Sequence, residues 1–398
     1  MKKEKWSKFR HKVIFTLLRF PFKAFFYFKY NLHLEKEKLP DEGAVILCNH
    51  TMALDPFIVG CKFNKPIYYM TSKDLFQNKF VGKLIRWLVN PIPKEKSNKG
   101  DLAAIKDCMK VSKENATICI FPEGNRTFTG KLGNVDPSIV KLIKLLKKPL
   151  IICNIIGGYS SDPRWSNKRR KGRIDIVTRT KLEYEEFKDM DNDEMYQMIV
   201  HDLTVDEYML DIPFKGKKKA EYLESILHIC PICKDEHCLI SKGDHLYCSS
   251  CNLDVTYTIN RTFESNNEEF KFKYVHEWYD YQVDVLNKRT YDDNTVIYED
   301  NIEVYEPIMN QKKKYIGKGK MILYNDSFKF TLDKEELILS FDDISAVTLL
   351  GRMKMNIYYK DKVYQVYNNR RTNLIKYMHV FYIIKNKKRG IENGFIGI

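Results

Sequence analysis

The stretch AVILCNHTMALDP, residues 44–56, decides the fold of the first half of this chain. Its five apolar residues, 44–48, have the length and composition of a buried strand. Asp55 followed by Pro56 is typical of a helix start, because Asp caps the first amides and proline is tolerated in the first turn. The pattern therefore predicts a strand, a polar turn that carries His50, and a helix.

His50 and Asp55 are five positions apart, and on a continuous helix five steps would point their side chains in different directions. They meet only if the segment between them turns. A carboxylate beside a neutral imidazole fixes its tautomer and stabilises the imidazolium, so the imidazole can take a proton from a hydroxyl. We interpret His50 as a general base and Asp55 as the group that orients it.

A second motif, FPEGNRT at residues 121–127, follows another apolar run. Gly124 permits close approach of the backbone, and Arg126 offers a planar fork for a phosphate group. Glu123 cannot bind phosphate itself. We expect it to hold Arg126 or the loop in place, or to accept a hydrogen bond from a substrate hydroxyl. Together the two motifs favour transfer chemistry on a phosphorylated substrate.

The order His-x4-Asp and then Phe-Pro-Glu-Gly-x-Arg resembles the glycerolipid acyltransferase family, over roughly residues 36 to 210. Between the motifs, KDLF at 73–76 and PIPK at 91–94 resemble the family's block that binds the acceptor's phosphate. Lys94 stands where the family usually has Arg, which keeps the charge but not the fork. The resemblance implies that five residues belong to the acceptor's phosphate site: Lys73, Lys94, Glu123, Gly124 and Arg126.

The resemblance also implies an α/β domain over residues 36–215, with a mixed sheet flanked by helices. His50 would deprotonate the sn-2 hydroxyl of lysophosphatidic acid, and the alkoxide would attack the thioester of acyl-CoA or acyl carrier protein. The product would be phosphatidic acid. Glycerol 3-phosphate or another lysophospholipid is the alternative acceptor. Thioester hydrolysis by water and a catalytically silent lipid-binding scaffold are the alternative functions, and the intact dyad argues against the scaffold.

The N-terminal segment is strongly basic. The chain has 398 residues, which is enough for two or three domains, and a formal net charge of +15. Residues 1–30 hold seven Lys and two Arg against one Glu, a net +8, and favour an anionic surface as partner. Their two apolar runs are shorter than the roughly 18 residues a spanning helix needs. We expect residues 1–35 to form a pair of amphipathic helices at the cytoplasmic face of the cell membrane.

The ten cysteines fall into two groups. Five are scattered singly in apolar surroundings and are typical of buried, reduced thiols in a cytosolic chain. The other five lie within 22 residues, where CPIC at 230–233 and CSSC at 248–251 are separated by 14 residues. That spacing predicts a zinc ribbon over residues 228–258, with Cys238 as a bystander. The expected ligands of its structural zinc ion are Cys230, Cys233, Cys248 and Cys251.

The last third of the chain, residues 265–398, is rich in short alternating strands and ends in a segment of helical periodicity, 373–385. This order resembles a PH-like or GRAM-like antiparallel barrel with a C-terminal helix. Its lysines at 312–314, 318 and 320 would suit lipid headgroups, and a protein-docking barrel is the equal alternative. Nucleic acid is an unlikely partner, because the ribbon holds two lysines against four acidic residues.

Overall fold

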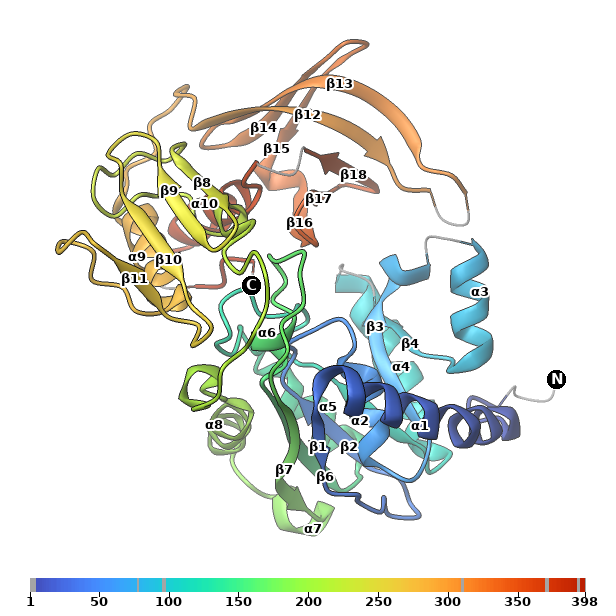
Figure 1. Ribbon diagram of the computed structural model, residues 1–398. Coiled ribbons are helices and arrows are strands. Elements are labelled where there is room, and N and C mark those ends of the chain that lie inside the picture. The colour runs from blue at the N-terminus through green and yellow to red at the C-terminus, as the bar shows by residue number, and fades with distance from the viewer. Residues whose placement is uncertain are drawn as a thin grey trace. The chain divides into compact units, whose positions relative to one another are not determined.

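The computed structural model describes residues 5–76, 79–94, 98–308, 311–368, 372–391 and 394–397. The chain divides into two compact units. The first comprises Met1–Pro163 and Lys171–Phe214, and the second comprises Arg164–Arg170 and Lys215–Ile398. Each unit is described by itself, and Figure 1 shows the elements of both.

The first unit is built on a seven-stranded mixed sheet with the order β1-β7-β6-β2-β5-β3-β4. Strand β7 runs antiparallel to β6, and the other neighbours are parallel. The mixed sheet expected from the sequence is therefore present. Its strands are β1 (Leu32–Leu34), β2 (Val45–Cys48), β3 (Ile67–Ser72), β4 (Ile92–Lys94), β5 (Thr117–Ile120), β6 (Leu150–Ile156) and β7 (Ile174–Leu182).

Helices cover both faces of this sheet (Figure 1). Val45 and Leu47 of β2 join the core formed with α4, α5 and α8, whereas Ile46 and Cys48 join the core formed with α1 and α2. Strand β2 is thus buried on both sides, which explains its continuous apolar run. The helices are α1 (Phe9–Tyr30), α2 (Asp55–Lys62), α3 (Lys79–Leu88), α4 (Asn98–Lys113), α5 (Ser138–Leu146), α6 (Gly158–Ser161), α7 (Tyr184–Phe187) and α8 (Asn192–Leu203).

The N-terminal segment forms one continuous helix, so the prediction of a helix pair was wrong. Pro21 lies inside α1, although proline removes an intrahelical hydrogen bond. Tertiary contacts hold both ends of the helix. Before it, the backbone N–H groups of Trp6 and Ser7 donate to the Glu114 carboxylate, and near its end Tyr30 is buried in the core. Among the helices that the structure describes, none is long and apolar enough to cross a membrane.

The closing helix of the first unit is shorter than the sequence pattern indicated. The sequence of residues 192–208 predicts a single closing helix, but α8 ends at Leu203 and a 3-10 turn, Glu207–Met209, follows separately. Thr204 adopts an extended conformation at the end of α8. The chain then turns across the domain, and this places Val205 and Glu207 against the loops described below.

The second unit contains two antiparallel sheets and two long helices. The ribbon sheet has the order β11-β10-β9-β8, and the larger sheet has the order β15-β14-β13-β12-β18-β17-β16. The ribbon strands are β8 (Leu239–Lys242), β9 (His245–Cys248), β10 (Asp254–Tyr257) and β11 (Phe263–Ser265). The larger sheet comprises β12 (Tyr298–Glu306), β13 (Lys314–Leu323), β14 (Ser327–Leu332), β15 (Glu336–Ser340), β16 (Ile344–Leu350), β17 (Lys354–Tyr359) and β18 (Lys362–Tyr367).

Helices α9 (Val275–Lys288) and α10 (Ile375–Lys388) complete the second unit. The indole N–H of Trp278 on α9 donates to Ile229 in the ribbon, and Tyr279 on the same helix contacts His379 on α10. Phe381 on α10 packs against the larger sheet. An antiparallel sheet with a C-terminal helix is therefore present, while its assignment as PH-like or GRAM-like stays a prediction.

One short segment belongs to the second unit although it lies between α6 and β7 in the chain. Residues 164–170 are held there by stacking and hydrogen bonds. The Arg170 guanidinium lies 4.9 Å and 5.0 Å from the ring centres of Trp165 and Tyr257 and donates to the carbonyl of Lys219. The chain therefore passes between the units at residues 164 and 170 as well as near the predicted boundary at residue 215.

Candidate active site

His50 and Asp55 are brought together by the turn between β2 and α2. His50 Nδ1 lies 2.7 Å from Asp55 Oδ2, and the same oxygen accepts the backbone N–H groups of Thr51 and Met52. Asp55 is fully buried. In the tautomer that carries its proton on Nδ1, His50 donates to this carboxylate, and Nε2 is then the acceptor of the imidazole.

Asp55 is the first residue of α2 rather than its N-cap, which is Leu54. Its carboxylate turns back toward the residues that precede the helix. The Thr51 hydroxyl completes the set by donating to Oδ1 at 3.0 Å. The segment between His50 and Asp55 is therefore organised around the buried carboxylate, which fixes the orientation of the imidazole.

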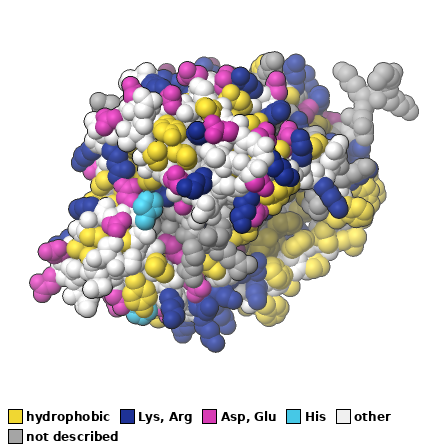
Figure 2. All heavy atoms as spheres, turned by 90° about the horizontal axis from the view of Figure 1, so that it is seen from above, with side chains coloured by type: hydrophobic (Ala, Val, Ile, Leu, Met, Phe, Trp, Pro, Cys, Tyr) yellow, Lys and Arg dark blue, Asp and Glu magenta, His cyan; other side chains and the backbone are white. Residues whose placement is uncertain are grey.

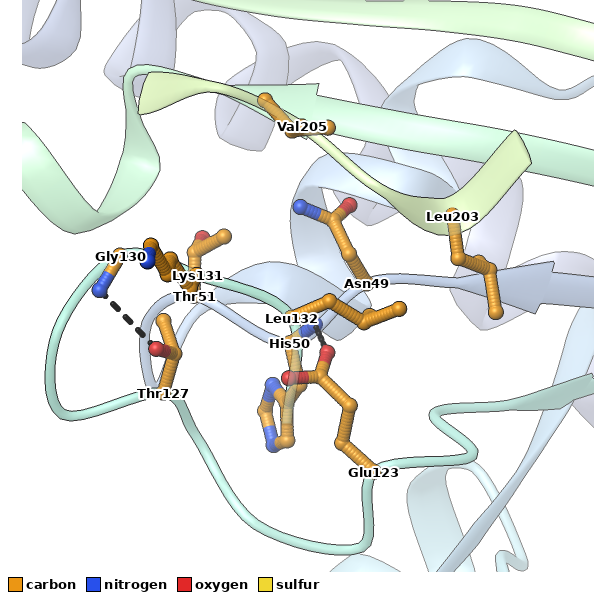
Figure 3. Close-up of a pocket in the computed structure, with 10 residues that line it drawn as sticks. All are labelled: Asn49, His50, Thr51, Glu123, Thr127, Gly130, Lys131, Leu132, Leu203 and Val205. Carbon is orange, nitrogen blue, oxygen red and sulfur yellow. Dashed lines mark hydrogen bonds between the residues drawn. The ribbon is translucent and has the colours of Figure 1, made fainter. Parts of the chain in front are cut away.

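The carboxylate of Glu123 joins the two motif loops. It accepts the backbone N–H of His50 at 2.5 Å (Figure 3). It also accepts that of Gly133 at 2.8 Å. Burial raises the pKa of Glu123 to about 8, while these two backbone donors act in the opposite direction. A further backbone hydrogen bond, from Thr127 N–H to the His50 carbonyl, ties the loops at 2.9 Å. The contacts of Glu123 are thus with the backbone of the loops.

Arg126 and Gly124 lie in the second motif loop, close to the dyad. Burial lowers the pKa of the Arg126 guanidinium, and the carboxylates of Asp55 and Asp162 oppose that effect. Arg126 therefore lies within electrostatic reach of Asp55. Gly124 has a φ of +67°, a left-handed conformation that suits glycine and that β-carbon sterics disfavour in other residues.

Lys73 and Lys94 lie at the ends of two neighbouring strands. Lys73 begins the 3-10 turn Lys73–Phe76 directly after β3, and Lys94 ends β4, where it pairs in register with Ser72. Strand β3 is also parallel to β5, which leads into the second motif. The carboxyl ends of these strands share one edge of the sheet, and ligand sites of α/β sheets lie at such an edge.

A small pocket beside His50 contains residues that the sequence motifs did not single out (Figure 3). Lys131 follows the second motif by a few residues, and Leu203 and Val205 come from the end of α8 and beyond it. A basic residue shortly after an Arg-bearing loop was the available signal for Lys131. No local signal pointed to Leu203 or Val205. The lining residues are Asn49, His50, Thr51, Glu123, Thr127, Gly130, Lys131, Leu132, Leu203 and Val205.

Asn49, which precedes the base, and Gly158, in α6, hold the His50 turn against the neighbouring elements. The side chain of Asn49 donates to the carbonyl of Ile155 at 2.9 Å and accepts the N–H of Ile155 at 2.7 Å. Gly158 packs so closely that a β-carbon added there would lie 2.1 Å from Thr51 Oγ1. Thr51 can therefore keep its hydrogen bond to Asp55 only while residue 158 is glycine.

Replacing Gly158 by alanine is expected to lower kcat about 100-fold with a small change in KM. The new methyl group must displace Thr51, and a shift of about 1 Å in catalytic geometry can cost that much. Steady-state kinetics of the purified variant test this. Gly60→Ala is the matched control, because its β-carbon would meet Tyr69 at an ordinary 3.5 Å. Equal kinetics of the Gly158→Ala variant and the unmodified chain would contradict the proposed dependence on Thr51.

The ribbon cysteines form a separate candidate metal centre in the second unit. The Sγ atoms of Cys230, Cys233, Cys238 and Cys248 all lie within 4.8 Å of one another. Cys251 Sγ lies 3.6 Å from Cys230 Sγ. The cluster thus holds three of the four expected ligands together with Cys238, which the sequence interpretation had set aside, and the fourth expected ligand, Cys251, lies beside Cys230.

Comparison with known proteins gives the class of the first unit. A family model described as "Acyltransferase" matches residues 31–156, which include both motifs. The 1-acyl-sn-glycerophosphate (LPA) acyltransferase of Thermotoga maritima is a structural neighbour, with a TM-score of 0.41 and 17% identity over 48% of this chain and 79% of that chain. By the family match, residues 31–156 belong to an acyltransferase domain.

Curated relatives are more specific. The chain is 30% identical to the 1-acyl-sn-glycerol-3-phosphate acyltransferase of Bacillus subtilis over 38% of this chain and 73% of that protein. It is 23% identical to the protein of that name from Cocos nucifera, over 44% of this chain and 56% of that protein. The chain belongs to the 1-acyl-sn-glycerol-3-phosphate acyltransferase family. It is therefore an O-acyltransferase.

Proposed function

We propose that this enzyme transfers a fatty acyl group from a thioester to the sn-2 hydroxyl of lysophosphatidic acid, giving phosphatidic acid. The observation that carries the proposal is the His50–Asp55 pair, with 2.7 Å between Nδ1 and Oδ2. Nε2 of His50 is then free of the carboxylate. The proposed acceptor, lysophosphatidic acid, follows the names of the relatives, which are 1-acyl-sn-glycerol-3-phosphate acyltransferases. Acyl-CoA and acyl carrier protein are the two donors that fit this chemistry.

In the proposed reaction, His50 Nε2 takes the proton of the acceptor hydroxyl as its oxygen attacks the thioester carbonyl. Asp55 stabilises the imidazolium that forms. The tetrahedral intermediate collapses when the C–S bond breaks, and the leaving thiolate takes up the proton. The new C–O bond is the ester of the product. No acyl-enzyme is needed, so neither serine nor cysteine serves as a nucleophile.

The acceptor's phosphate is bound by Arg126 together with Lys73 and Lys94. Burial lowers the pKa of the Arg126 guanidinium and the nearby carboxylates oppose that effect; a guanidinium keeps its charge in proteins and offers a planar fork to phosphate. Glu123 contributes by holding the loop that carries Arg126 against the turn that carries His50. We call Arg126, Lys73 and Lys94 the phosphate clamp. By holding the phosphate, the clamp sets the position of the acceptor hydroxyl relative to His50, which the transfer step requires.

Replacing Arg126 by alanine is expected to raise the KM for lysophosphatidic acid about tenfold to a hundredfold. A hydrogen bond to a charged group is worth about 1.5–3 kcal/mol, and this one would be lost with the guanidinium. Arg173→Ala is the control, since Arg173 is half-exposed and forms a surface ion pair with Asp175. An unchanged KM in the Arg126→Ala variant would contradict the proposal that Arg126 binds the acceptor's phosphate.

The test of the reaction is an assay with full-length protein, vesicles that contain labelled lysophosphatidic acid, and either acyl-CoA or acyl carrier protein as donor. Labelled phosphatidic acid is the expected product. Glycerol 3-phosphate and lysophosphatidylcholine are tested as competing acceptors. Preferential acylation of either one would replace the proposed acceptor. Release of free fatty acid without any acceptor would identify a hydrolase instead.

The enzyme docks on the anionic cytoplasmic face of the cell membrane through α1 and α3. Phe9, Leu17 and Phe20 are 80%, 67% and 64% exposed and recur at helical spacing along α1. On α3, Phe80 and Trp87 are 84% and 53% exposed. Hydrophobic side chains gather along one edge of the face shown in Figure 2, where basic side chains also lie. Apolar stripes with basic flanks suit the membrane interface.

The two stripes are linked by Arg10. Its Nε donates to the carbonyl of Trp87 at 3.1 Å, and its guanidinium lies 5.9 Å from the centre of the Trp87 ring. The contact holds the start of α1 beside the end of α3. A lysophospholipid acceptor resides in the bilayer, so a docking surface on the first unit would bring the enzyme to its substrate.

Replacing Leu17 and Phe20 together by glutamate is expected to lower partitioning onto anionic vesicles at least about tenfold. Each apolar side chain contributes about 1.5–3 kcal/mol on full burial, and the new charges oppose insertion. Vesicle sedimentation measures the effect. Leu145→Glu on α5 is the control, because Leu145 is 46% exposed and lies on another helix. Equal losses in both proteins would show that the effect is not specific to α1.

The ribbon cysteines bind one structural zinc ion. A tetrahedral zinc site with Zn–S bonds of about 2.3 Å places any two sulfurs about 3.8 Å apart. The pairs Cys230–Cys251 and Cys233–Cys248, each at 3.6 Å, fit that spacing. Four thiolates leave no position for water, so the ion stabilises the fold of the ribbon and takes no part in acyl transfer.

A further inference from the structure

The ribbon brings five sulfur atoms to a site that has room for four. Cys238 Sγ lies within 4.8 Å of the sulfurs of Cys230, Cys233 and Cys248. Cys251 Sγ lies 3.6 Å from that of Cys230. Cys230, Cys233 and Cys248 therefore belong to the cluster in either case. Cys238 and Cys251 are both available for the fourth position.

Cys238 is fixed in the cluster by contacts with both knuckles. Its Sγ lies 3.3 Å from the carbonyl oxygen of Asp235, which also accepts the N–H of Cys230 at 2.9 Å. Its own carbonyl accepts the N–H and the hydroxyl of Ser249 at 2.9 and 3.2 Å. Cys238 is thus tied through Asp235 to the first knuckle and through Ser249 to the second.

The two thiols differ in their access to solvent. Cys238 is 1% exposed, whereas Cys251 is partly exposed. The Cys238 sulfur already lies within 4.8 Å of three other cysteine sulfurs, so it can join their metal ion without a change in the fold. A partly exposed thiol can leave the ion and be hydrated.

We propose that Cys238 is a metal ligand that shares the fourth position of the zinc site with Cys251. Cys230, Cys233 and Cys248 are the constant ligands. The inference rests on the proposed zinc site and adds to it a reserve ligand: when one of the two thiols is lost, the other completes the tetrahedron. The ribbon therefore keeps its metal after a change that would open an ordinary four-cysteine site.

Cobalt(II) replacement in the full-length protein tests the proposal, because the visible absorption of bound cobalt distinguishes four sulfur ligands from three. Metal content is measured in parallel. The variants are Cys238→Ser, Cys251→Ser and the double substitution, with Cys230→Ser as the variant of a constant ligand. We expect both single variants to bind one ion with a four-sulfur spectrum. We expect the double variant and Cys230→Ser to lose that spectrum.

Two results would overturn the shared position. If Cys251→Ser loses the four-sulfur spectrum while Cys238→Ser matches the unmodified protein, Cys238 is a bystander. If Cys238→Ser alone loses it, Cys238 is an exclusive ligand and Cys251 lies outside the site. Failure of the zinc proposal itself looks different, since the unmodified protein would then bind neither zinc nor cobalt.

Discussion

His50→Ala is expected to lower kcat for acyl transfer by about 10²–10⁴-fold, the usual contribution of a positioned general base. The imidazole is the group that accepts the hydroxyl proton, and its Nδ1 is 2.7 Å from the Asp55 carboxylate. The KM for the acceptor should change little, because His50 acts on the reacting hydroxyl and the phosphate is held elsewhere. Initial rates with saturating thioester and varied lysophosphatidic acid measure both quantities.

The chain supplies a matched control for this result. His201 Nδ1 lies 2.9 Å from Asp202 Oδ1, so the two residues form a second His–Asp pair, and the His201 side chain is 88% exposed on the surface. His201→Ala should leave both kcat and KM unchanged. If His50→Ala kept full turnover, the assignment of His50 as the base would fail, whatever the behaviour of the control.

Cys230→Ser is expected to abolish zinc binding and to unfold the ribbon locally. Apparent binding free energies of structural zinc are about 10–16 kcal/mol in small zinc domains, and this energy is largely folding energy. A ribbon of about 30 residues has too small a core to replace it. Zinc content together with hydrogen exchange of β8, β9 and β10 reports the loss, and a chelator should produce the same exchange pattern in the unmodified protein.

Cys108→Ser is the appropriate control for the zinc experiment. Cys108 is fully buried in the core of the first unit and lies outside the ribbon cluster. The variant should keep one zinc ion and full protection of the ribbon strands, even if the first unit loses some stability. Retention of zinc and of ribbon protection in Cys230→Ser would contradict the structural role of the metal.

Much of the candidate active site could be predicted because its signals are local. The apolar run before His50 and the Asp-Pro pair after it indicate a strand, a turn and a helix within a dozen residues. The structure has β2 and α2 at those places, and the imidazole meets the carboxylate across the turn.

Elements without a clear pattern were missed. Strands β12 and β16 lie in the larger sheet of the second unit but were not predicted, and α3 was not predicted as a helix. Strand β12 carries several charged residues among its apolar ones, and it is held by pairing with both β13 and β18. Pairing between segments distant in sequence, and not local preference, determines such a strand.

The sequence by itself determined the dyad, the Arg-bearing loop and the paired CxxC knuckles, because each is encoded within a few consecutive residues. The tertiary structure alone decided that α1 continues through Pro21, that residues 164–170 pack into the second unit, and that Cys238 joins the ribbon cluster. Each of these depends on contacts between residues far apart in the chain. The free energy of these contacts outweighs the local conformational preferences of the residues. A local sequence pattern does not reveal such contacts.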